Sequence, residues 1–240
     1  LGEKTNILEL WHGPTCAFKD LALQLLPYLL TTSAKKVSAG KKTVILVATS
    51  GDTGKAALEG FRDVEGTEII VFYPSEGVSP MQKLQMSSQK GNNVHVCAIK
   101  GNFDDAQTGV KKIFVDGAVA EALDGKNMKF SSANSINWGR LAPQIVYYVS
   151  AYCDMKNNGE DLSDGFNVVV PTGNFGNILA AYYAKKIGVP INKLICASNA
   201  NNVLTDFIRT GTYDRNRHFY TTVSPSMDIL ISSNLERMLF

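Results

Sequence analysis

Four short segments of this sequence combine glycines with hydroxyl, amide or charged side chains, the residue types that bind anions and take part in catalysis. The first is 12–20, His-Gly-Pro-Thr-Cys-Ala-Phe-Lys-Asp, in which Gly-Pro forces a turn and Asp20 can begin a helix. Lys19 follows two apolar residues at this change of chain direction. A lysine in apolar surroundings has a lowered pKa, and its uncharged amine is a nucleophile. The alternative is a lysine whose stem packs while its charged end reaches solvent. Residue type alone does not decide between these two interpretations of Lys19.

The second and third segments each follow a short apolar run and precede a helical pattern. Residues 48–54, Ala-Thr-Ser-Gly-Asp-Thr-Gly, offer backbone amides and hydroxyls to a carboxylate. They do not form a Walker A loop, because the glycines are too close and Ala56 stands where a magnesium-binding hydroxyl is needed. Residues 173–177, Gly-Asn-Phe-Gly-Asn, place amides at a helix N-terminus, where a phosphate binds. They lack the spacing of a dinucleotide site. An ordinary strand-to-helix turn also explains each segment.

The fourth segment is 131–140, Ser-Ser-Ala-Asn-Ser-Ile-Asn-Trp-Gly-Arg. Its polar side chains stand beside Arg140, whose planar cation suits a phosphate or a carboxylate. The alternative is a helix N-cap made by Asn134, Ser135 or Asn137, with Arg140 exposed. Neither the cysteines nor the histidines show metal-ligand spacing, and no catalytic triad can be read from their order.

Alternating strand and helix patterns must position these segments. Apolar, β-branched runs predict strands buried on both faces, as in parallel sheets, at 43–48, 69–73, 94–99, 168–170 and 194–197. Helical periodicity predicts helices from about 138 to 155 and from 176 to 188. Pro27 is expected to end the helix that follows Lys19 early, or to kink it. The alternation predicts an α/β fold with parallel sheets flanked by helices.

Two polar stretches, at 35–42 and 157–165, mark expected boundaries. They predict a smaller α/β lobe, 41–148, set into a larger cofactor-binding lobe made of 1–40 and 149–240. Composition agrees with a globular protein: 45% of the 240 residues are hydrophobic, and the formal net charge is +2. Scattered basic residues predict no nucleic-acid partner, and the absence of a long apolar run predicts no membrane partner. Widely spaced cysteines suggest reduced thiols and a cytoplasmic location.

Taken together, the segments resemble threonine synthase, a family of pyridoxal-phosphate enzymes. The family patterns His-Gly-Pro-Thr-x-Ala-Phe-Lys-Asp, Ala-Thr-Ser-Gly-Asp-Thr-Gly, Ser-Pro-x-Gln, Ser-Ala-Asn-Ser-Ile-Asn and Gly-Asn-Phe-Gly occur at 12–20, 48–54, 79–82, 132–137 and 173–176. They occur in the family's order and extend across nearly the whole chain. Each match alone is weak evidence, but five matches in the family's order are strong evidence for the resemblance.

The resemblance implies a fold-type II enzyme similar to the β subunit of tryptophan synthase, with two α/β lobes around a cofactor cleft. Lys19 would be the catalytic residue and would bind pyridoxal 5'-phosphate as a Schiff base. The cofactor phosphate would lie on Gly173, Asn174, Phe175, Gly176 and Asn177, and the ring hydroxyl near Asn134. The substrate carboxylate would be bound by Thr49, Ser50, Asp52 and Thr53, and the substrate phosphate by Arg140 with Ser135 or Asn137.

The implied reaction converts O-phospho-L-homoserine and water into L-threonine and phosphate, in a monomer or a homodimer. The sequence departs from the family in length: family members have a lobe before the lysine motif and continue beyond Phe240, where the contact to the pyridine nitrogen is expected. The chain is therefore expected to be truncated at both ends. Three alternatives stay open: a relative that stops at elimination and releases 2-oxobutanoate, a cofactor-free binding protein or inactive fragment, and a sulfhydrylase of the same fold type, which usually carries Asn where Asp52 stands.

Overall fold

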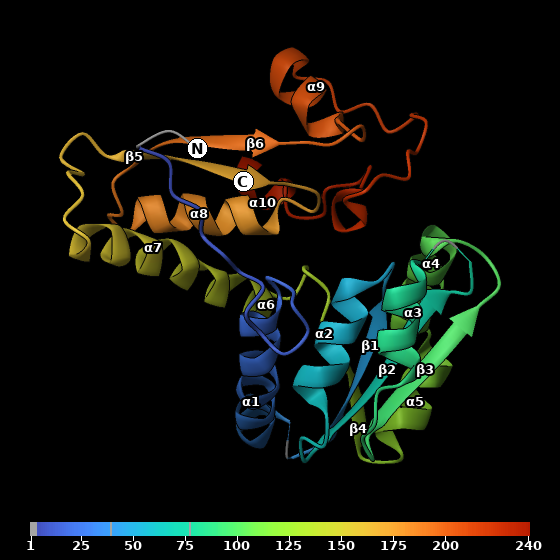
Figure 1. Cartoon of the computed structure of the whole chain (residues 1–240). Coiled ribbons are helices and arrows are strands. Elements are labelled where there is room, and N and C mark those ends of the chain that lie inside the picture. The colour runs from blue at the N-terminus through green and yellow to red at the C-terminus, as the bar shows by residue number, and fades with distance from the viewer. Residues whose placement is uncertain (1–3, 39, 77) are drawn as a thin grey trace.

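A parallel four-stranded sheet forms one half of the protein in this computed structural model, which describes residues 4–38, 40–76 and 78–240 (Figure 1). Its strands are β1 (Lys42–Ala48), β2 (Thr67–Pro74), β3 (Val94–Ile99) and β4 (Met128–Ser132). Their spatial order is β3-β2-β1-β4, and each neighbouring pair is parallel. The central strands β1 and β2 are rich in β-branched residues, which pack well on a pleated surface.

Helices cover both faces of this sheet because successive side chains of a strand point to opposite sides. Ile45 and Val47 of β1 face a core shared with α1 (Asp20–Val37), α2 (Asp52–Phe61) and α3 (Pro80–Ser87). Val44 and Leu46 face the opposite core, shared with α4 (Phe103–Val115) and α5 (Gly117–Asp124). The predicted α/β class, with parallel strands between helices, is confirmed.

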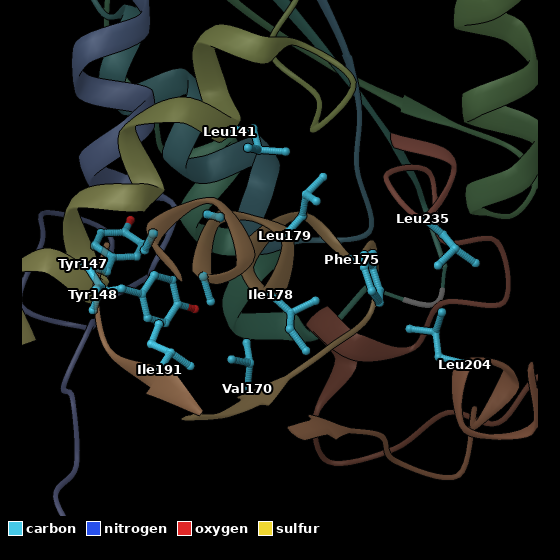
Figure 2. Packing of buried hydrophobic residues seen from close by; sticks show 14 of the residues in the cluster. Leu141, Tyr147, Tyr148, Val170, Phe175, Ile178, Leu179, Ile191, Leu204 and Leu235 are labelled. Atoms are coloured by element: carbon cyan, nitrogen blue, oxygen red, sulfur yellow. The ribbon is translucent and has the colours of Figure 1, made fainter. Parts of the chain in front are cut away.

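The second half contains a two-stranded parallel sheet of β5 (Phe166–Pro171) and β6 (Ile191–Ala197). The helices α7 (Ile145–Asn157) and α8 (Gly176–Lys186) pack together beside it (Figure 1). Their core cluster includes Tyr148, Ile178, Leu179 and Ile191, whose side chains Figure 2 shows converging. Beyond β6 the chain forms α9 (Val203–Thr210), a 3-10 turn at Pro225–Met227 and a short α10 (Glu236–Leu239).

The sequence predicted that Pro27 ends the helix after Lys19 early or kinks it, and the early end is wrong. The helix α1 continues from Asp20 to Val37 with Pro27 inside it. Pro27 has no N–H to donate to the carbonyl of Leu23, four residues earlier. Gly60 of α2 packs directly against that carbonyl, where a Cβ atom would collide. The close contact between the two helices holds the segment around the proline in place.

The single helix predicted at 138–155 is divided. It consists of α6 (Trp138–Leu141), a 3-10 turn (Ala142–Gln144) and α7. Pro143 explains the break, because it cannot donate the hydrogen bond that a continuous α-helix would make to the residue four positions before it. The helix predicted at 176–188 is confirmed as α8, which ends at Lys186.

All five predicted strands are present, but burial on both faces is wrong for three of them. All residues of β3 and most residues of β5 and β6 are partly or fully exposed. The strand β3 lies at the edge of its sheet, and α8 packs beside the sheet of β5 and β6 (Figure 1). The strand β4 was not predicted, because Lys129 and two serines interrupt its apolar pattern.

The predicted division into lobes stays a prediction, with one observation that bears on its boundary. Leu23 and Leu26 of α1 belong to the core of the four-stranded sheet, although residues 1–40 were assigned to the other lobe.

In the described part of the chain, no helix is long and apolar enough to cross a membrane. Over the same residues, no cluster of His, Cys, Asp or Glu side chains could hold a metal ion.

Candidate active site

A pocket lies where the loop before α1, the turn around α6, the β5–α8 loop and the 225–227 turn meet. Its empty volume is about 400 Å³, part of which is open to solvent. It is lined by Phe18, Lys19, Ser135, Arg140, Gln144, Pro171, Thr172, Gly173, Asn174, Phe175, Gly176, Asn177, Ile178, Ser226 and Met227. Phe175 and Ile178 also belong to the hydrophobic cluster of Figure 2, so the pocket wall rests on a packed core.

Lys19 is buried at the pocket wall, with only 5% of its surface exposed. Its Nζ pairs with a carboxylate oxygen of Asp52 and lies 4.3 Å from the centre of the Phe18 ring. Burial lowers the pKa of Lys19 below its ordinary value; the charge of Asp52 opposes this shift and that of Arg140 adds to it. The alternative of a solvent-exposed lysine is wrong for this residue.

Two buried side chains fix the backbone that carries Lys19. The carboxylate of Asp20 accepts hydrogen bonds from Thr15 N at 2.9 Å, from Ala17 N at 3.3 Å and from the Thr15 hydroxyl. The hydroxyl of Tyr147 donates to the carbonyl oxygen of Phe18. Burial raises the pKa of Tyr147 above its ordinary value, so the phenol keeps the proton that it donates. Asp20 and Tyr147 therefore both hold the loop that carries Lys19 in place.

Asp52 lies at the start of α2 and joins three parts of the chain. Besides Lys19, it accepts hydrogen bonds from Thr53 N at 2.7 Å and from the Ser226 hydroxyl at 2.7 Å. Burial alone would raise the pKa of Asp52, but the charge and hydrogen bond of Lys19 and the hydrogen bond of Ser226 lower it below the ordinary value. Asp52 is thus a carboxylate that balances the lysine charge.

The 173–177 segment presents free amides at the N-terminus of α8. The carbonyl oxygen of Gly173 accepts from the Ser232 hydroxyl at 2.5 Å, and that of Asn174 accepts from Asn234 N and Nδ2 at 3.1 Å each. In a trans peptide the N–H points opposite to the carbonyl, so the amides that follow point away from residues 232–234. Phe175 has a left-handed backbone, with φ of 63°. Within the described residues, the N–H groups of 174–177 donate to no protein acceptor. This arrangement fits a phosphate group.

Arg140 is buried at the wall of the same pocket. The alternative interpretation, an exposed Arg140, is therefore wrong. Only 3% of its surface is accessible, and Nη1 donates to the carbonyl of Ala133 at 3.0 Å. Burial lowers the pKa of Arg140 to about 10, partly offset by the nearby Asp52 charge. Ser135 lines the pocket beside it and contacts the Ser233 hydroxyl at 3.2 Å.

Six of the predicted site residues are not among those that line this pocket: Thr49, Ser50, Asp52, Thr53, Asn134 and Asn137. The Thr49 hydroxyl accepts from Gly51 N and Gly54 N, which shapes its own loop. Asn134 Nδ2 donates to Ala48 O at 3.0 Å, and Asn137 caps α6 through Gly139 N at 2.9 Å. Their roles toward a ligand stay predictions.

Several residues that line or support the pocket were missed by the sequence interpretation. Gln144 lines the wall one helical turn after Arg140, and Tyr147 holds the Lys19 loop. Others belong to residues 225–237, here named the C-terminal brace. Of these, Ser226 and Met227 line the pocket, and Ser232, Asn234 and Arg237 bond to the backbone around it. The guanidinium of Arg237 donates to Asn234 Oδ1 at 2.7 Å and to the carbonyl oxygens of Ser135 and Ile136. The serine-rich run at 232–234 was a polar signal, but nothing in the spacing related it to residues 135 or 173.

Comparison with known proteins agrees with this geometry. The family model described as "Pyridoxal-phosphate dependent enzyme" matches residues 6–238. Threonine synthase-like 1 of Homo sapiens is 50% identical over 241 residues, which cover 97% of this chain and 32% of that protein. Threonine synthase of Saccharomyces cerevisiae is 44% identical over 247 residues, covering 100% of this chain and 47% of the relative.

Among solved structures, the pyridoxal-phosphate-bound threonine synthase of Brucella melitensis superposes with a TM-score of 0.84 at 45% identity. The match covers 98% of this chain and 48% of that one, so the chain spans about half the length of the threonine synthases that it matches. The resemblance inferred from the motifs and the expected cofactor are both confirmed at the level of the family. The buried amine of Lys19 and the free amides of 174–177 fit that cofactor's aldehyde and phosphate. This chain belongs to the pyridoxal-phosphate dependent enzyme family, within which it is similar to threonine synthases.

Proposed function

We propose that this chain carries the catalytic lysine and the phosphate-binding loop of a carbon–oxygen lyase of threonine biosynthesis. The reaction converts O-phospho-L-homoserine and water into L-threonine and phosphate. The observation that carries the proposal is the position of Lys19, a buried amine paired with Asp52, on one pocket with the amides of 173–177 and the Arg140 cation. The similarity to threonine synthases over nearly the whole chain supports this choice of substrate.

Pyridoxal phosphate, when bound, supplies an electron-accepting ring next to the substrate Cα. The chain's own residues bind and orient the reactants around that ring. The amides of 173–177 and the N-terminus of α8 hold the cofactor phosphate. Lys19 would attach the cofactor, and its amine, whose pKa burial lowers, would move protons at Cα and Cβ. Asp52 holds the Lys19 amine in place and balances its charge.

We assign the substrate phosphate to Arg140 and Ser135, which line the same pocket. A buried guanidinium in a water-poor site stabilises a dianionic leaving group better than an exposed one does. Asn134 for the cofactor hydroxyl, Asn137 for the phosphate, and Thr49, Ser50 and Thr53 for the carboxylate are kept as second-rank assignments. In the structure, the side chains of Thr49, Asn134 and Asn137 bond to nearby backbone groups.

Product analysis separates this proposal from a relative that stops after elimination. The chain is loaded with pyridoxal phosphate and given O-phospho-L-homoserine, and threonine, 2-oxobutanoate and phosphate are quantified. Threonine and phosphate in equal amounts are expected. Phosphate released with 2-oxobutanoate alone contradicts the proposal, as does product formation by Lys19→Ala at the rate of the original chain. A preference for an acetylated serine over phosphohomoserine points instead to the sulfhydrylase alternative.

The assembly and boundaries of the protein are part of the same proposal. We assign 1–40 and 149–240 to the cofactor-binding lobe and 41–148 to the smaller lobe. The protein acts on a small molecule as a monomer or homodimer in the cytoplasm. Light scattering of the purified chain measures the assembly directly.

A further inference from the structure

Two buried polar atoms on the pocket wall have no protein partner. Of the side-chain N and O atoms that the structure describes, four are buried and unpaired: Thr43 Oγ1, Arg140 Nε, Gln144 Oε1 and Arg217 Nε. Two of these, Arg140 Nε and Gln144 Oε1, belong to residues that line the pocket with Lys19. Arg140 and Gln144 are 3% and 2% exposed, so bulk solvent does not satisfy either atom.

The orientation of the Gln144 amide follows from its hydrogen bond. Nε2 donates to the carbonyl oxygen of Arg140 at 2.9 Å, so the remaining amide atom is the acceptor Oε1. The caps at Leu141, Ala142, Gln144 and Ile145 all have right-handed helical backbone, so residues 140 and 144 stand one turn apart on one face. The face therefore carries one unpaired donor, Arg140 Nε, and one unpaired acceptor, Gln144 Oε1.

A donor and an acceptor on one face of the same pocket are paired together by a ligand that can accept and donate at once. An ionised phosphate or carboxylate satisfies the arginine but only repels the Gln144 carbonyl, since both groups are acceptors. A water molecule satisfies both, and two to four polar partners are what a buried water needs. Buried polar groups in proteins are paired with protein or ordered water in the great majority of cases.

We propose that Arg140 Nε and Gln144 Oε1 bind the water molecule that the proposed reaction consumes, so that Gln144 is a substrate-binding residue. This inference rests on the proposed function. The water accepts from Arg140 and donates one hydrogen to Gln144, which leaves a lone pair and the second hydrogen for reaction. The Arg140 cation also polarises the bound water and makes its proton easier to remove.

When phosphate leaves Cγ, one of the two protons taken from Cα and Cβ returns to Cγ and the other leaves with the phosphate, so that a Cα–Cβ double bond remains. The hydration step then balances as an addition across that double bond. The water oxygen forms a bond to Cβ, and one of its O–H bonds breaks. The released proton passes to the Lys19 amine and from there to Cα, so that no oxidant or reductant is needed. Without the held water, the same unsaturated species is released and hydrolysed to the keto acid. Gln144 thus favours threonine over 2-oxobutanoate.

The variant Gln144→Met removes the acceptor and keeps the length and apolar volume of the side chain. We expect the ratio of threonine to 2-oxobutanoate to fall about tenfold, the effect of losing one positioned hydrogen bond, while phosphate release is retained. Gln144→Asn keeps a polar amide but shortens the side chain by one methylene group, so that the amide no longer reaches the water. The ratio of threonine to 2-oxobutanoate should fall in this variant as it does in Gln144→Met. The matched control is Thr43→Val, which removes a buried unpaired hydroxyl on β1 outside the pocket. Its product ratio should equal that of the original chain.

A high-resolution crystal structure of the pyridoxal-phosphate-loaded chain provides a readout that is independent of turnover. Density for one water between Arg140 Nε and Gln144 Oε1, lost in Gln144→Met, is expected. Absence of that water overturns the inference. A water that is present while both Gln144 variants keep the original product ratio is structural only and overturns it equally. If the original chain makes no threonine at all, the proposed function itself fails, which is a different result from an unchanged ratio.

Discussion

The chemistry at Lys19 depends on two opposing influences on a single amine. Burial and the Arg140 charge lower the pKa of Lys19, whereas the Asp52 carboxylate raises it. The sequence indicated apolar neighbours for Lys19 but could not show that a carboxylate 33 positions away would pair with it. Asp52 itself was expected to meet a substrate carboxylate, although two carboxylates repel each other. That role stays a prediction, and the contacts that the structure shows for Asp52 are with Lys19 and Ser226.

Asp52→Asn should move the reactivity of Lys19 to lower pH. The substitution removes the charge that raises the pKa of Lys19 and leaves the burial and Arg140 effects that lower it, so the amine loses its proton at a lower pH. The measurement is the rate at which pyridoxal phosphate becomes trapped on Lys19 by borohydride across a pH series. The half-maximal pH should fall in the variant. Asp206→Asn, which removes a carboxylate paired with Arg217, is the control and should leave the profile in place. A half-maximum that rises or stays fixed contradicts this account of the site.

At the scale of elements, the position of the Lys19 loop depends on how closely α1 approaches α2. Gly60 faces the carbonyl of Leu23, the carbonyl that Pro27 leaves without its intrahelical partner. A sequence pattern reports the proline but not the helix that packs against it, so the early end, one of the two outcomes expected for α1, was wrong. The β-branched runs were a more reliable signal, because a strand's apolar pattern is local, and all five indicated strands are present.

Gly60→Ala should destabilise the protein, and Gly109→Ala should not. A methyl group on Gly60 collides with backbone atoms of Leu23 that cannot move aside, an overpacking that costs about 1–3 kcal/mol. Gly109, inside α4, has nothing within 4 Å of the added methyl, and alanine there should stabilise by about 0.5–1 kcal/mol. Urea unfolding of the two variants beside the original chain measures both changes. Equal midpoints for the two variants would show that the α1–α2 contact is not as close as described.

At the scale of the whole molecule, the C-terminal brace joins segments that are distant in sequence. It contacts Asp52 through Ser226, the 173–174 carbonyls through Ser232 and Asn234, and the 135–136 carbonyls through Arg237. Residues 225–237 have no long periodic element, so their course could not be predicted from patterning. The chain order of the motifs predicted which segments form the site, but not the brace that holds them together.

Arg237→Ala should weaken both the fold and cofactor binding. The loss of hydrogen bonds from a charged group costs about 1.5–3 kcal/mol of unfolding free energy. Because Asn234 then loses its partner, the Asn174 carbonyl is less firmly held and the amides of 174–177 are less well oriented. The dissociation constant for pyridoxal phosphate should rise, as followed by absorbance titration. Arg209→Ala, on the exposed side of α9, is the control and should change neither quantity. An Arg237→Ala chain that is less stable yet binds the cofactor as well as before would limit the brace to a structural role.

The central claim is that Lys19 is the residue that binds the cofactor, and chemical trapping tests it most directly. The chain is incubated with pyridoxal phosphate, reduced with borohydride and digested, and the modified peptide is identified by mass spectrometry. We predict one modified lysine, Lys19, within the peptide around His12–Asp20, and no adduct there in Lys19→Ala. An adduct on any of the other lysines in place of Lys19, or undiminished labelling of the Lys19→Ala chain, would contradict the account.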